Sequence, residues 1–174
     1  MSNDRVDFLA KVSAFRGVDK EGLKRLSGIC NVVERPAGEV IIKEGEEGDC
    51  VYIIEKGQVE ISMSISMVPS LDEPRSEPID KVLVRLDPGA MFGEMAFIFD
   101  RDVRSATIVA LTDVRLLSIT SSDFGRLANE DVNSAYIIIS NIARIIAERL
   151  RKSNQDVKKL TTVLSVALRK PRRS

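Results

Sequence analysis

The sequence predicts a mainly β domain, either a sandwich or a barrel, that lies between helical segments at the two ends of the chain. From Val32 to Ile119 the apolar residues occur in short runs, many of them β-branched and separated by glycine. Before and after this stretch, apolar residues recur at intervals of three and four, which is typical of amphipathic helices. The chain has 174 residues, 44% of them hydrophobic, and is therefore long enough to bury a core of its own.

Residues 1–30 predict an N-terminal helical segment. Val12, Leu23 and Leu26 are among its apolar positions with helical spacing, and the pattern is interrupted before Asp19. Asp19 precedes the second apolar group and is expected to cap the helix that follows. We therefore expect two short helices here.

Residues 31–130 predict the β domain. The runs assigned to strands are Val40–Ile42, Val51–Ile54, Val59–Ile65, Val82–Leu86, Ala106–Ala110 and Val114–Ile119. The glycines between them are expected to be turn residues with positive φ rather than ligand contacts: Gly38, Gly45, Gly48, Gly57 and Gly89. The segment from Pro69 to Asp80, rich in proline and acidic residues, predicts a solvated loop. Phe124 and Leu127 predict one short helix after the last strand.

Residues 131–168 predict a single long helix. Asp131 is expected to cap it, and apolar residues continue at helical spacing from Ile138 to Ala167. Helices longer than about 25 residues usually pair with another helix. We therefore expect a homodimer through this helix; the alternative for residues 132–150 is that the helix packs on the barrel of its own chain.

The inventory of ionisable residues restricts the chemistry. The chain has 26 basic residues, 26 acidic residues and no histidine. Zinc sites that use histidine, serine–histidine–aspartate triads and cysteine–histidine pairs are thereby excluded, and no metal site is expected. Cys30 and Cys50 are too few for a four-thiolate site and are expected to be reduced, small apolar residues. No nucleophile with a positioned base is evident, so we do not expect an enzyme.

The charges are unevenly distributed along the chain. Residues 144–174 contain ten basic and two acidic side chains, a net charge of +8, so residues 1–143 sum to −8. The basic tail, residues 169–174, is expected to aid solubility and to complement the helix dipole; binding of nucleic acid, acidic lipid or an acidic partner is the alternative. The charged N-terminus and the lack of a run of about 18 apolar residues predict a cytoplasmic protein without a membrane span.

The segment 92–107 carries the strongest functional signal. A short helix that begins near Gly93 would offer free backbone N–H groups, and the missing Cβ would let an anion approach them. Arg104, expected to open a strand, would be able to grip two phosphate oxygens with its guanidinium. Glu94 beside such a site suits a sugar hydroxyl, because a carboxylate accepts hydrogen bonds. An anion next to a hydroxyl indicates a nucleotide.

This segment resembles the phosphate-binding cassette of the cyclic nucleotide-binding domain family. The hallmark of the cassette is Phe-Gly-Glu, Leu or Met, Ala, a variable stretch, then Arg, a small residue, Ala and Thr, and residues 92–107 fill every one of these positions. The runs from Pro36 to Ile54 and from Gly57 to Ile61 also resemble the opening strands of the family. The resemblance extends over residues 5–155.

The resemblance implies a jelly-roll β-barrel with N-terminal helices and a long C-terminal helix, in which cAMP, or alternatively cGMP, sits against the short cassette helix. Matched position by position, Arg104 would grip the phosphate and Glu94 would accept a hydrogen bond from the ribose 2′-hydroxyl. Gly93 and Ala96 would donate from the backbone, and Ser105 would add a phosphate or base contact. The residues implied to bind the ligand are Gly93, Glu94, Met95, Ala96, Arg104, Ser105 and Ala106.

Three further residues are candidates for base contacts. Thr107 is the last residue of the cassette. Ser153 and Asn154 match a Thr-Ser pair in the long helix of the bacterial cAMP receptor protein when the two helices are aligned on Arg149-Leu150. This alignment requires a four-residue insertion upstream. The side chains of Phe92, Met95 and Phe97 are expected to pack in the core rather than to stack on a base.

Together these features predict a cyclic nucleotide sensor whose occupancy moves the C-terminal helix and so acts on a dimer or on an unknown effector protein. Serine rather than threonine directly after Arg104 favours cAMP. Members of the family that read DNA continue for about 60 residues beyond the long helix, so no helix-turn-helix is expected here. One alternative is a ligand-free dimerisation or scaffold module, in which Arg104 and Glu94 form an exposed ion pair. The other is binding of an acidic partner through the basic tail.

Overall fold

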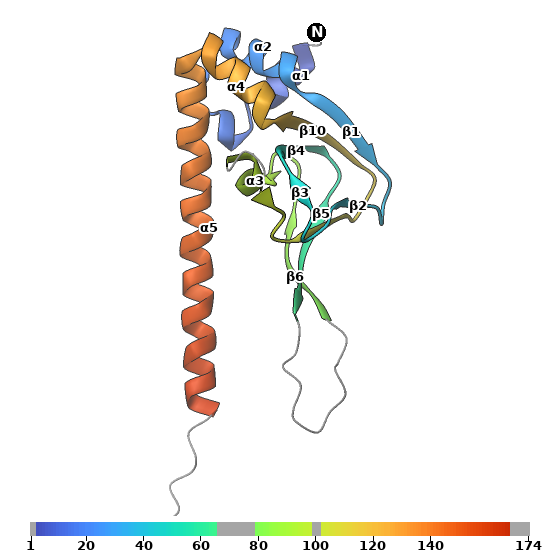
Figure 1. Ribbon diagram of the computed structural model, residues 1–174, viewed down its shortest axis with the longest axis vertical. Helices are drawn as coiled ribbons and strands as arrows, with labels where there is room; N and C mark the ends of the chain where they lie inside the picture. Colours follow the sequence, from blue (N-terminus) through green and yellow to red (C-terminus); the bar gives the residue numbers. More distant parts are fainter. Residues whose placement is uncertain (1–2, 66–78, 99–101, 168–174) are drawn as a thin grey trace, which may run out of the picture.

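The strands of the computed structural model, which describes residues 3–65, 79–98 and 102–167, form two four-stranded antiparallel sheets and one two-stranded sheet. The sheets enclose a barrel that stands beside the first half of one long helix (Figure 1). The chain is therefore a jelly-roll barrel with flanking helices, and the predicted fold class is confirmed.

The first sheet has the strand order β1-β10-β4-β7, the second has the order β2-β9-β5-β6, and β3 pairs with β8. The bounds are β1 Asn31–Arg35, β2 Val40–Ile42, β3 Glu47–Gly48, β4 Cys50–Lys56, β5 Val59–Ile65, β6 Ile79–Leu86, β7 Met91–Phe92, β8 Asp102–Val103, β9 Thr107–Ala110 and β10 Val114–Thr120. The central strands β4 and β10 contribute the most buried apolar side chains, and Ile53, Ile54, Leu116 and Leu117 are fully buried. Their burial anchors the barrel.

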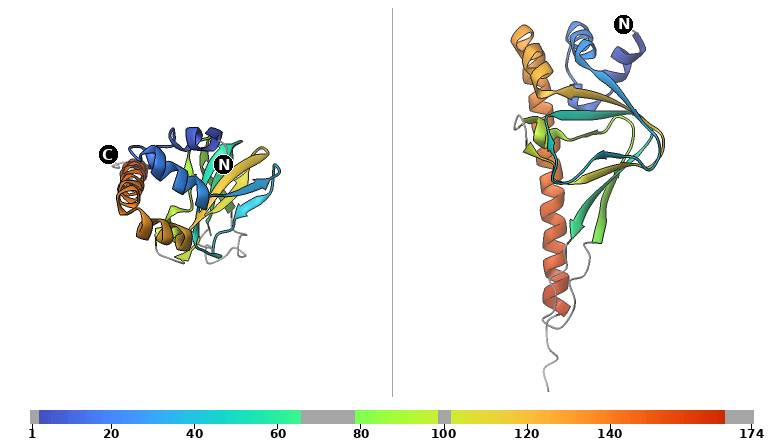
Figure 2. Two further views of the ribbon diagram at one scale, coloured as in Figure 1. Left: turned by 90° about the horizontal axis from the view of Figure 1, so that it is seen from above. Right: turned by 45° about the vertical axis from the view of Figure 1, so that its right-hand side comes forward.

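The hairpin of β5 and β6 extends past the barrel. Its register runs from Val59 opposite Leu86 to Ile65 opposite Ile79, whereas β9 accompanies β5 only as far as Ser62. Figure 2 shows this hairpin projecting in the same direction as the second half of the long helix.

The N-terminal segment consists of α1 (Asn3–Leu9), the 3-10 turn η1 (Ser13–Phe15) and α2 (Lys20–Ile29). Asp19 caps α2, because its carboxylate accepts a hydrogen bond of 2.7 Å from the backbone N–H of Gly22. The cap expected at Asp19 is confirmed. Leu9 and Leu26 are fully buried where these helices close one end of the barrel.

Two helices follow the last strand, α4 (Ser121–Glu130) and α5 (Val132–Ala167). Asp131 caps α5, accepting a 3.0 Å hydrogen bond from the backbone N–H of Ser134. With 36 residues, α5 is about 54 Å long. Ile138 and Ile142 are buried in the core that α5 shares with the other helices, so the first half of α5 packs on its own chain. Residues 151–167 are exposed throughout.

Some elements differ from the sequence-based expectation. Four short strands, β1, β3, β7 and β8, were not predicted, because strands of two to five residues with few buried positions leave almost no periodic signal. Gly48 was expected to be a positive-φ turn residue, but it lies in β3 and is not among the glycines with positive φ. Arg104 and Ala106 were expected in a strand, whereas β9 begins only at Thr107. Most of the loop predicted from Pro69 to Asp80, and the basic tail 169–174, lie outside the described residues.

Candidate functional site

A cavity of about 100 Å³ lies where the barrel, the short helix α3 (Glu94–Ile98) and α5 meet. Its lining comes from distant parts of the chain: Ile42, Ile61, Phe92, Gly93, Glu94, Met95, Val103, Arg104, Ser105, Ala106, Ile108 and Arg149. Apolar side chains form most of the wall, and two ionisable side chains from the cassette, with one from α5, reach into it. Such a combination is typical of a site for a small polar ligand.

Arg104 is held firmly at this cavity although its side chain is long. The residue is only 7% exposed. Its backbone N–H donates to the carbonyl of Glu46 at 2.8 Å, next to the β3–β8 pair. Its guanidinium donates from Nη1 to the carbonyl of Gly93 at 3.1 Å and from Nη2 to the carbonyl of Cys50 at 3.0 Å. These bonds use part of the five donors of the guanidinium and leave others for a ligand.

Two glycines make room for this arginine. A Cβ at Gly48 would overlap Nε and the rest of the Arg104 guanidinium, and a Cβ at Gly93 would lie 2.9 Å from Nη1. Gly93 also has a φ of +79°, a conformation that side chains of L-residues rarely adopt. Glycine at both positions therefore serves the close approach of the guanidinium to the backbone.

Glu94 is also 7% exposed, and it pairs with the long helix. Nη1 of Arg149 donates to Oε1 of Glu94 at 2.6 Å, and Nη2 of Arg149 donates to the carbonyl of Met91 at 2.6 Å. The ion pair expected as an alternative, between Arg104 and Glu94 and exposed, is absent among the described residues: both side chains are buried, and Glu94 pairs with Arg149 instead. The pair is a direct link between the cassette and α5.

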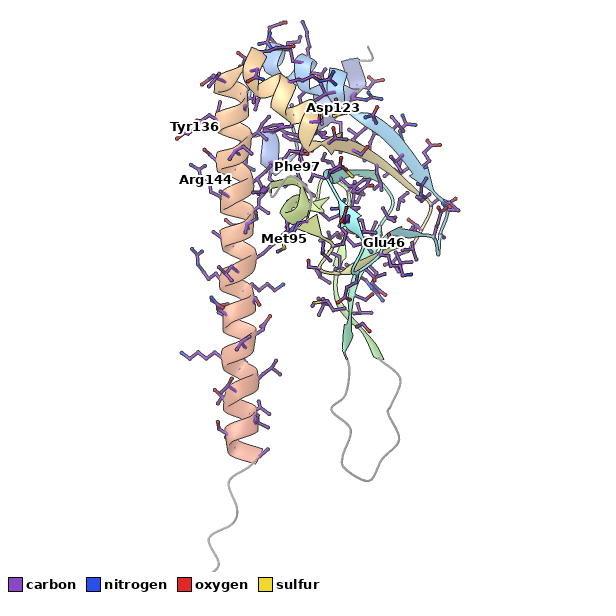
Figure 3. All side chains as sticks on the ribbon, viewed as in Figure 1. Glu46, Met95, Phe97, Asp123, Tyr136 and Arg144 are labelled. Carbon is purple, nitrogen blue, oxygen red and sulfur yellow. The ribbon has the colours of Figure 1, made fainter. Side chains whose placement is uncertain are left out.

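The structure brings most of the sequence-predicted residues to the cavity. Glu94 and Arg104 reach it with their side chains, and Gly93, Met95, Ser105 and Ala106 line it. Met95 was expected in the core, but it is 48% exposed beside the cavity, whereas Phe92 and Phe97 are buried as expected. Figure 3 shows Met95 and Phe97 on the same short helix. Met95 is exposed and Phe97 is buried because α3 is a single turn at the surface, and only one of its sides faces the core.

Thr107, Ser153 and Asn154 are not in the cavity lining. Ala96 lies in α3. The hydroxyl of Thr107 accepts a 3.1 Å hydrogen bond from the backbone N–H of Glu44. Ser153 and Asn154 lie in the exposed second half of α5. The roles expected for these residues stay predictions.

Arg149 and Gly48 are site residues that sequence reasoning did not identify. Arg149 follows Ile138, Ile142 and Ile145 at intervals of four, three and four, so helical spacing alone places it on the barrel-facing side. The sequence therefore already contained a signal that would have identified Arg149. Gly48 offered no comparable signal, because its role depends on a side chain that is distant in the sequence.

The wall beneath Arg104 contains a half-buried thiol and an aromatic pair. The Sγ of Cys50 lies 3.5 Å from Nη2 of Arg104. Tyr52 stacks on Phe92 with ring centroids 5.2 Å apart, and burial raises the pKa of Tyr52 to about 12. Burial likewise raises the pKa of the Cys30 thiol, in the helical core, to about 12. Both cysteines are free thiols, as expected.

Comparison with known proteins places this fold and site in one family. Residues 32–131 match the cyclic nucleotide-binding domain, and the chain belongs to this family. It is similar to a CRP-like cAMP-activated global transcriptional regulator of Mycobacterium tuberculosis, with 28% identity over 156 residues that cover 87% of this chain and 61% of the regulator. It is also similar to cGMP-dependent protein kinase 2 of Homo sapiens, with 30% identity over 167 residues that cover 93% of this chain and 20% of the kinase.

Solved structures of related proteins have the same fold. The Thermus thermophilus catabolite activator protein superimposes with a TM-score of 0.71 and 25% identity, over 86% of this chain and 63% of that one. The chain thus spans about three fifths of the bacterial relatives and one fifth of the kinase. The family is one of regulatory binding domains rather than of catalytic ones. Within the described ranges, no helix combines the length and the hydropathy needed to cross a bilayer.

Proposed function

We propose that this chain is a cyclic nucleotide sensor that binds cAMP, with cGMP as the alternative ligand, and passes its occupancy to α5. The observation that carries the proposal is the buried guanidinium of Arg104. Buried charges are normally paired with an opposite charge. Among the ion pairs of the described residues none involves Arg104, whose acceptors are the neutral carbonyls of Gly93 and Cys50. A phosphate would supply the missing negative charge.

The other cassette residues fit the remaining parts of the ligand. Glu94 would accept the ribose 2′-hydroxyl, and the backbone N–H groups at Gly93 and Ala96 would add donors to the phosphate. Ser105 is exposed beside the cavity, and its hydroxyl, which donates a weak 3.8 Å hydrogen bond to the sulfur of Met95, would turn toward the phosphate or the base. We keep Thr107, with Ser153 and Asn154 on α5, as the candidates for base contacts.

The size of the cavity connects binding to movement of α5. Sites for small ligands usually measure about 300–1,000 Å³, and this cavity measures about 100 Å³. We infer that α3 and α5 move apart when a nucleotide enters, and that its ribose hydroxyl takes the place of Arg149 at Oε1 of Glu94. Ligand and helix thus compete for Glu94, which gives the two states different affinities, as a switch requires.

Dimerisation through α5 is the second part of the proposal. Its sequence has an uninterrupted seven-residue pattern of mostly apolar a and d positions, which predicts a left-handed coiled coil. The positions are Tyr136, Ala143, Leu150, Val157 and Leu164 at a, and Val132, Ile139, Ile146, Ser153, Leu160 and Ala167 at d. Tyr136, 72% exposed, points away from the barrel (Figure 3). Ile139, Ile146 and Leu150 also line an apolar groove of about 860 Å³ beside α3 and α4. A second α5 would cover this seam.

The relatives do not decide which base is bound, since their names include both cAMP and cGMP. Ser105 in the position after the arginine is our reason for preferring cAMP. We place the protein in the cytoplasm, where cyclic nucleotides are produced, and we assign it no catalytic step.

Titration calorimetry with cAMP, cGMP and 5′-AMP tests the proposal. We expect binding of one cyclic nucleotide and not of 5′-AMP. Arg104→Ala should weaken this binding by about 100-fold or more, because hydrogen bonds to a charged group contribute about 1.5–3 kcal/mol each. Arg144→Ala is the control, since Arg144 is an exposed arginine of α5 outside the cavity lining. If neither cAMP nor cGMP binds at millimolar concentration, the proposal is contradicted and the ligand-free assembly module is favoured.

A further inference from the structure

The two cysteines of the chain lie in different surroundings. Cys30 is buried within the helical core. Cys50 is half-buried at the start of β4, and neither of the two apolar cores formed by the described residues includes it. Its Sγ instead contacts the guanidinium of Arg104. The role of a small apolar residue, expected from the sequence for both cysteines, therefore accounts for Cys30 but not for Cys50.

Strand register brings Cys50 to this arginine. In the ladder of β4 and β7, Tyr52 lies opposite Phe92, so the start of β4 lies beside Gly93, which follows β7. A Cβ at Gly93 would be 3.0 Å from the carbonyl oxygen of Cys50. The carbonyls of Gly93 and Cys50 and the Sγ of Cys50 thereby converge on the guanidinium of Arg104. Cys50 thus presents a strong backbone acceptor and a weak side-chain acceptor.

Both acceptors of Cys50 engage the same nitrogen of Arg104. Nη2 lies 3.0 Å from the carbonyl oxygen and 3.5 Å from Sγ, whereas Nη1 lies 3.1 Å from the carbonyl oxygen of Gly93. A guanidinium holds two oxygens of one phosphate along an edge, either with Nε and Nη2 or with Nη1 and Nη2. Each of these edges includes Nη2. A phosphate that is gripped in this way therefore displaces one of the two acceptors of Cys50.

The sulfur is the acceptor that is displaced. The carbonyl is fixed by the backbone of β4, whose first residue, Cys50, lies opposite Thr120 in the ladder with β10. Sulfur is a weak acceptor, whereas a phosphate oxygen is charged and forms short, strong hydrogen bonds with a guanidinium. The hydroxyl of Tyr52 shares a hydrogen bond with the side chain of Cys50, so the thiol keeps a polar partner after it has lost Arg104.

We propose that the thiol of Cys50 is a placeholder for a phosphate oxygen: it positions Arg104 before the cyclic nucleotide binds and gives up Nη2 when the phosphate arrives. The inference rests on the proposed function, because it names the contact that is exchanged at the same site. Cys50 is a positioning residue, since it acts through Arg104. A stronger acceptor at position 50 would stabilise the ligand-free protein and weaken nucleotide binding, and loss of the acceptor would do the reverse.

A graded series at position 50 of the whole chain tests this, by thermal unfolding without ligand and by titration calorimetry with cAMP and cGMP. Cys50→Ala removes the side-chain acceptor and should lower Tm and tighten nucleotide binding by about 3- to 10-fold. Cys50→Asp places a negative charge beside the guanidinium and should raise Tm and weaken binding by about 100-fold or more. Cys50→Asn, which has the shape of aspartate without its charge, is the matched control and should bind with an affinity between those of the wild type and Cys50→Asp.

The opposite direction of the two effects distinguishes a placeholder from a residue that only fills space. If Cys50 only fills space, every variant lowers Tm and none binds the nucleotide more tightly than the wild type, which overturns the inference. Equal affinities of Cys50→Asp and Cys50→Asn overturn it as well. If Cys50→Asp does not fold, Cys50→Ala decides. In each of these cases a wild type that binds a cyclic nucleotide leaves the sensor intact, whereas a wild type that binds neither cAMP nor cGMP overturns the proposed function and the exchange together.

Discussion

Replacing Arg149 with glutamine separates the link between cassette and helix from the binding of the ligand itself. The substitution removes an ion pair of 2.6 Å with Glu94 and a 2.6 Å hydrogen bond to the carbonyl of Met91. Breaking a fully buried ion pair costs about 3–5 kcal/mol. The side chain of Glu94 is 9% exposed but that of Arg149 is 40% exposed, so water compensates part of the loss. We take about 1.5–3 kcal/mol, the usual range for hydrogen bonds to charged groups.

Thermal unfolding without ligand should show this loss directly. For a domain of this size each kcal/mol lowers Tm by about 2–4 °C, so the expected decrease is about 3–12 °C. The nucleotide should bind more tightly to Arg149→Gln, because the variant has no ion pair to give up when the ribose hydroxyl takes Glu94. If the bound state of the wild type retains none of the pair, the gain is about 10- to 100-fold in Kd.

Arg144→Gln is the control for this experiment. It removes the same charge from the same helix, at an exposed position, and should change neither Tm nor Kd beyond experimental error. The argument is refuted if Arg149→Gln binds the nucleotide more weakly than the wild type, because Arg149 would then support the ligand instead of competing with it. An unchanged Tm would show that the ion pair does not hold α5 to the cassette.

Two further predictions concern the backbone around Arg104 and the cap of α5. Gly48→Ala would force the Arg104 guanidinium out of its position and should weaken nucleotide binding by about 10-fold or more in calorimetry. Gly125 is a helical glycine with open space around it and provides the control. Gly125→Ala should leave binding unchanged and add about 0.5–1 kcal/mol to the free energy of unfolding. Hydrogen bonds from Ser134 lower the pKa of Asp131 from 3.8 to about 2, so this carboxylate stabilises the fold above pH 3.8 and loses its contribution as the pH falls toward 2. In urea unfolding, Asp131→Asn should therefore be less stable than the wild type near neutral pH, with a difference that largely disappears near pH 2. A difference that stays constant over this range would argue against the contribution of the ionised carboxylate.

The part of the site that is local in the sequence was predictable. Gly93, Glu94 and Arg104 lie within twelve residues of one another, and the missing Cβ of the glycine, the carboxylate and the guanidinium each suit one part of a nucleotide. The fold class was equally accessible, since alternating runs and glycine turns extend over a long stretch. The position of Met95 was not, because a single helical turn has too few residues to show which side faces the core.

The partners of the ionisable groups depended on contacts between distant segments. Nothing near Arg104 in the sequence indicates that Gly48 must lack a side chain, because the requirement arises only when β3 and the cassette come together. The pairing of Glu94 with Arg149 joins residues 55 positions apart. Helical spacing placed Arg149 on the inner side of α5, but it could not show which carboxylate would be there.

The sequence by itself determined a mainly β domain, its flanking helices, the cassette segment and the length of α5, because each of these depends on local spacing and on residue types within a short window; the barrel followed from the family resemblance. Only the tertiary structure decided that Arg104 is buried against carbonyls, that Glu94 is held by the long helix, and that the large apolar side chains of α5 from Val157 onward are exposed. The physical reason is the same in each case. Burial and electrostatic pairing are properties of the surroundings of a side chain, and these surroundings are assembled from segments that the sequence keeps far apart.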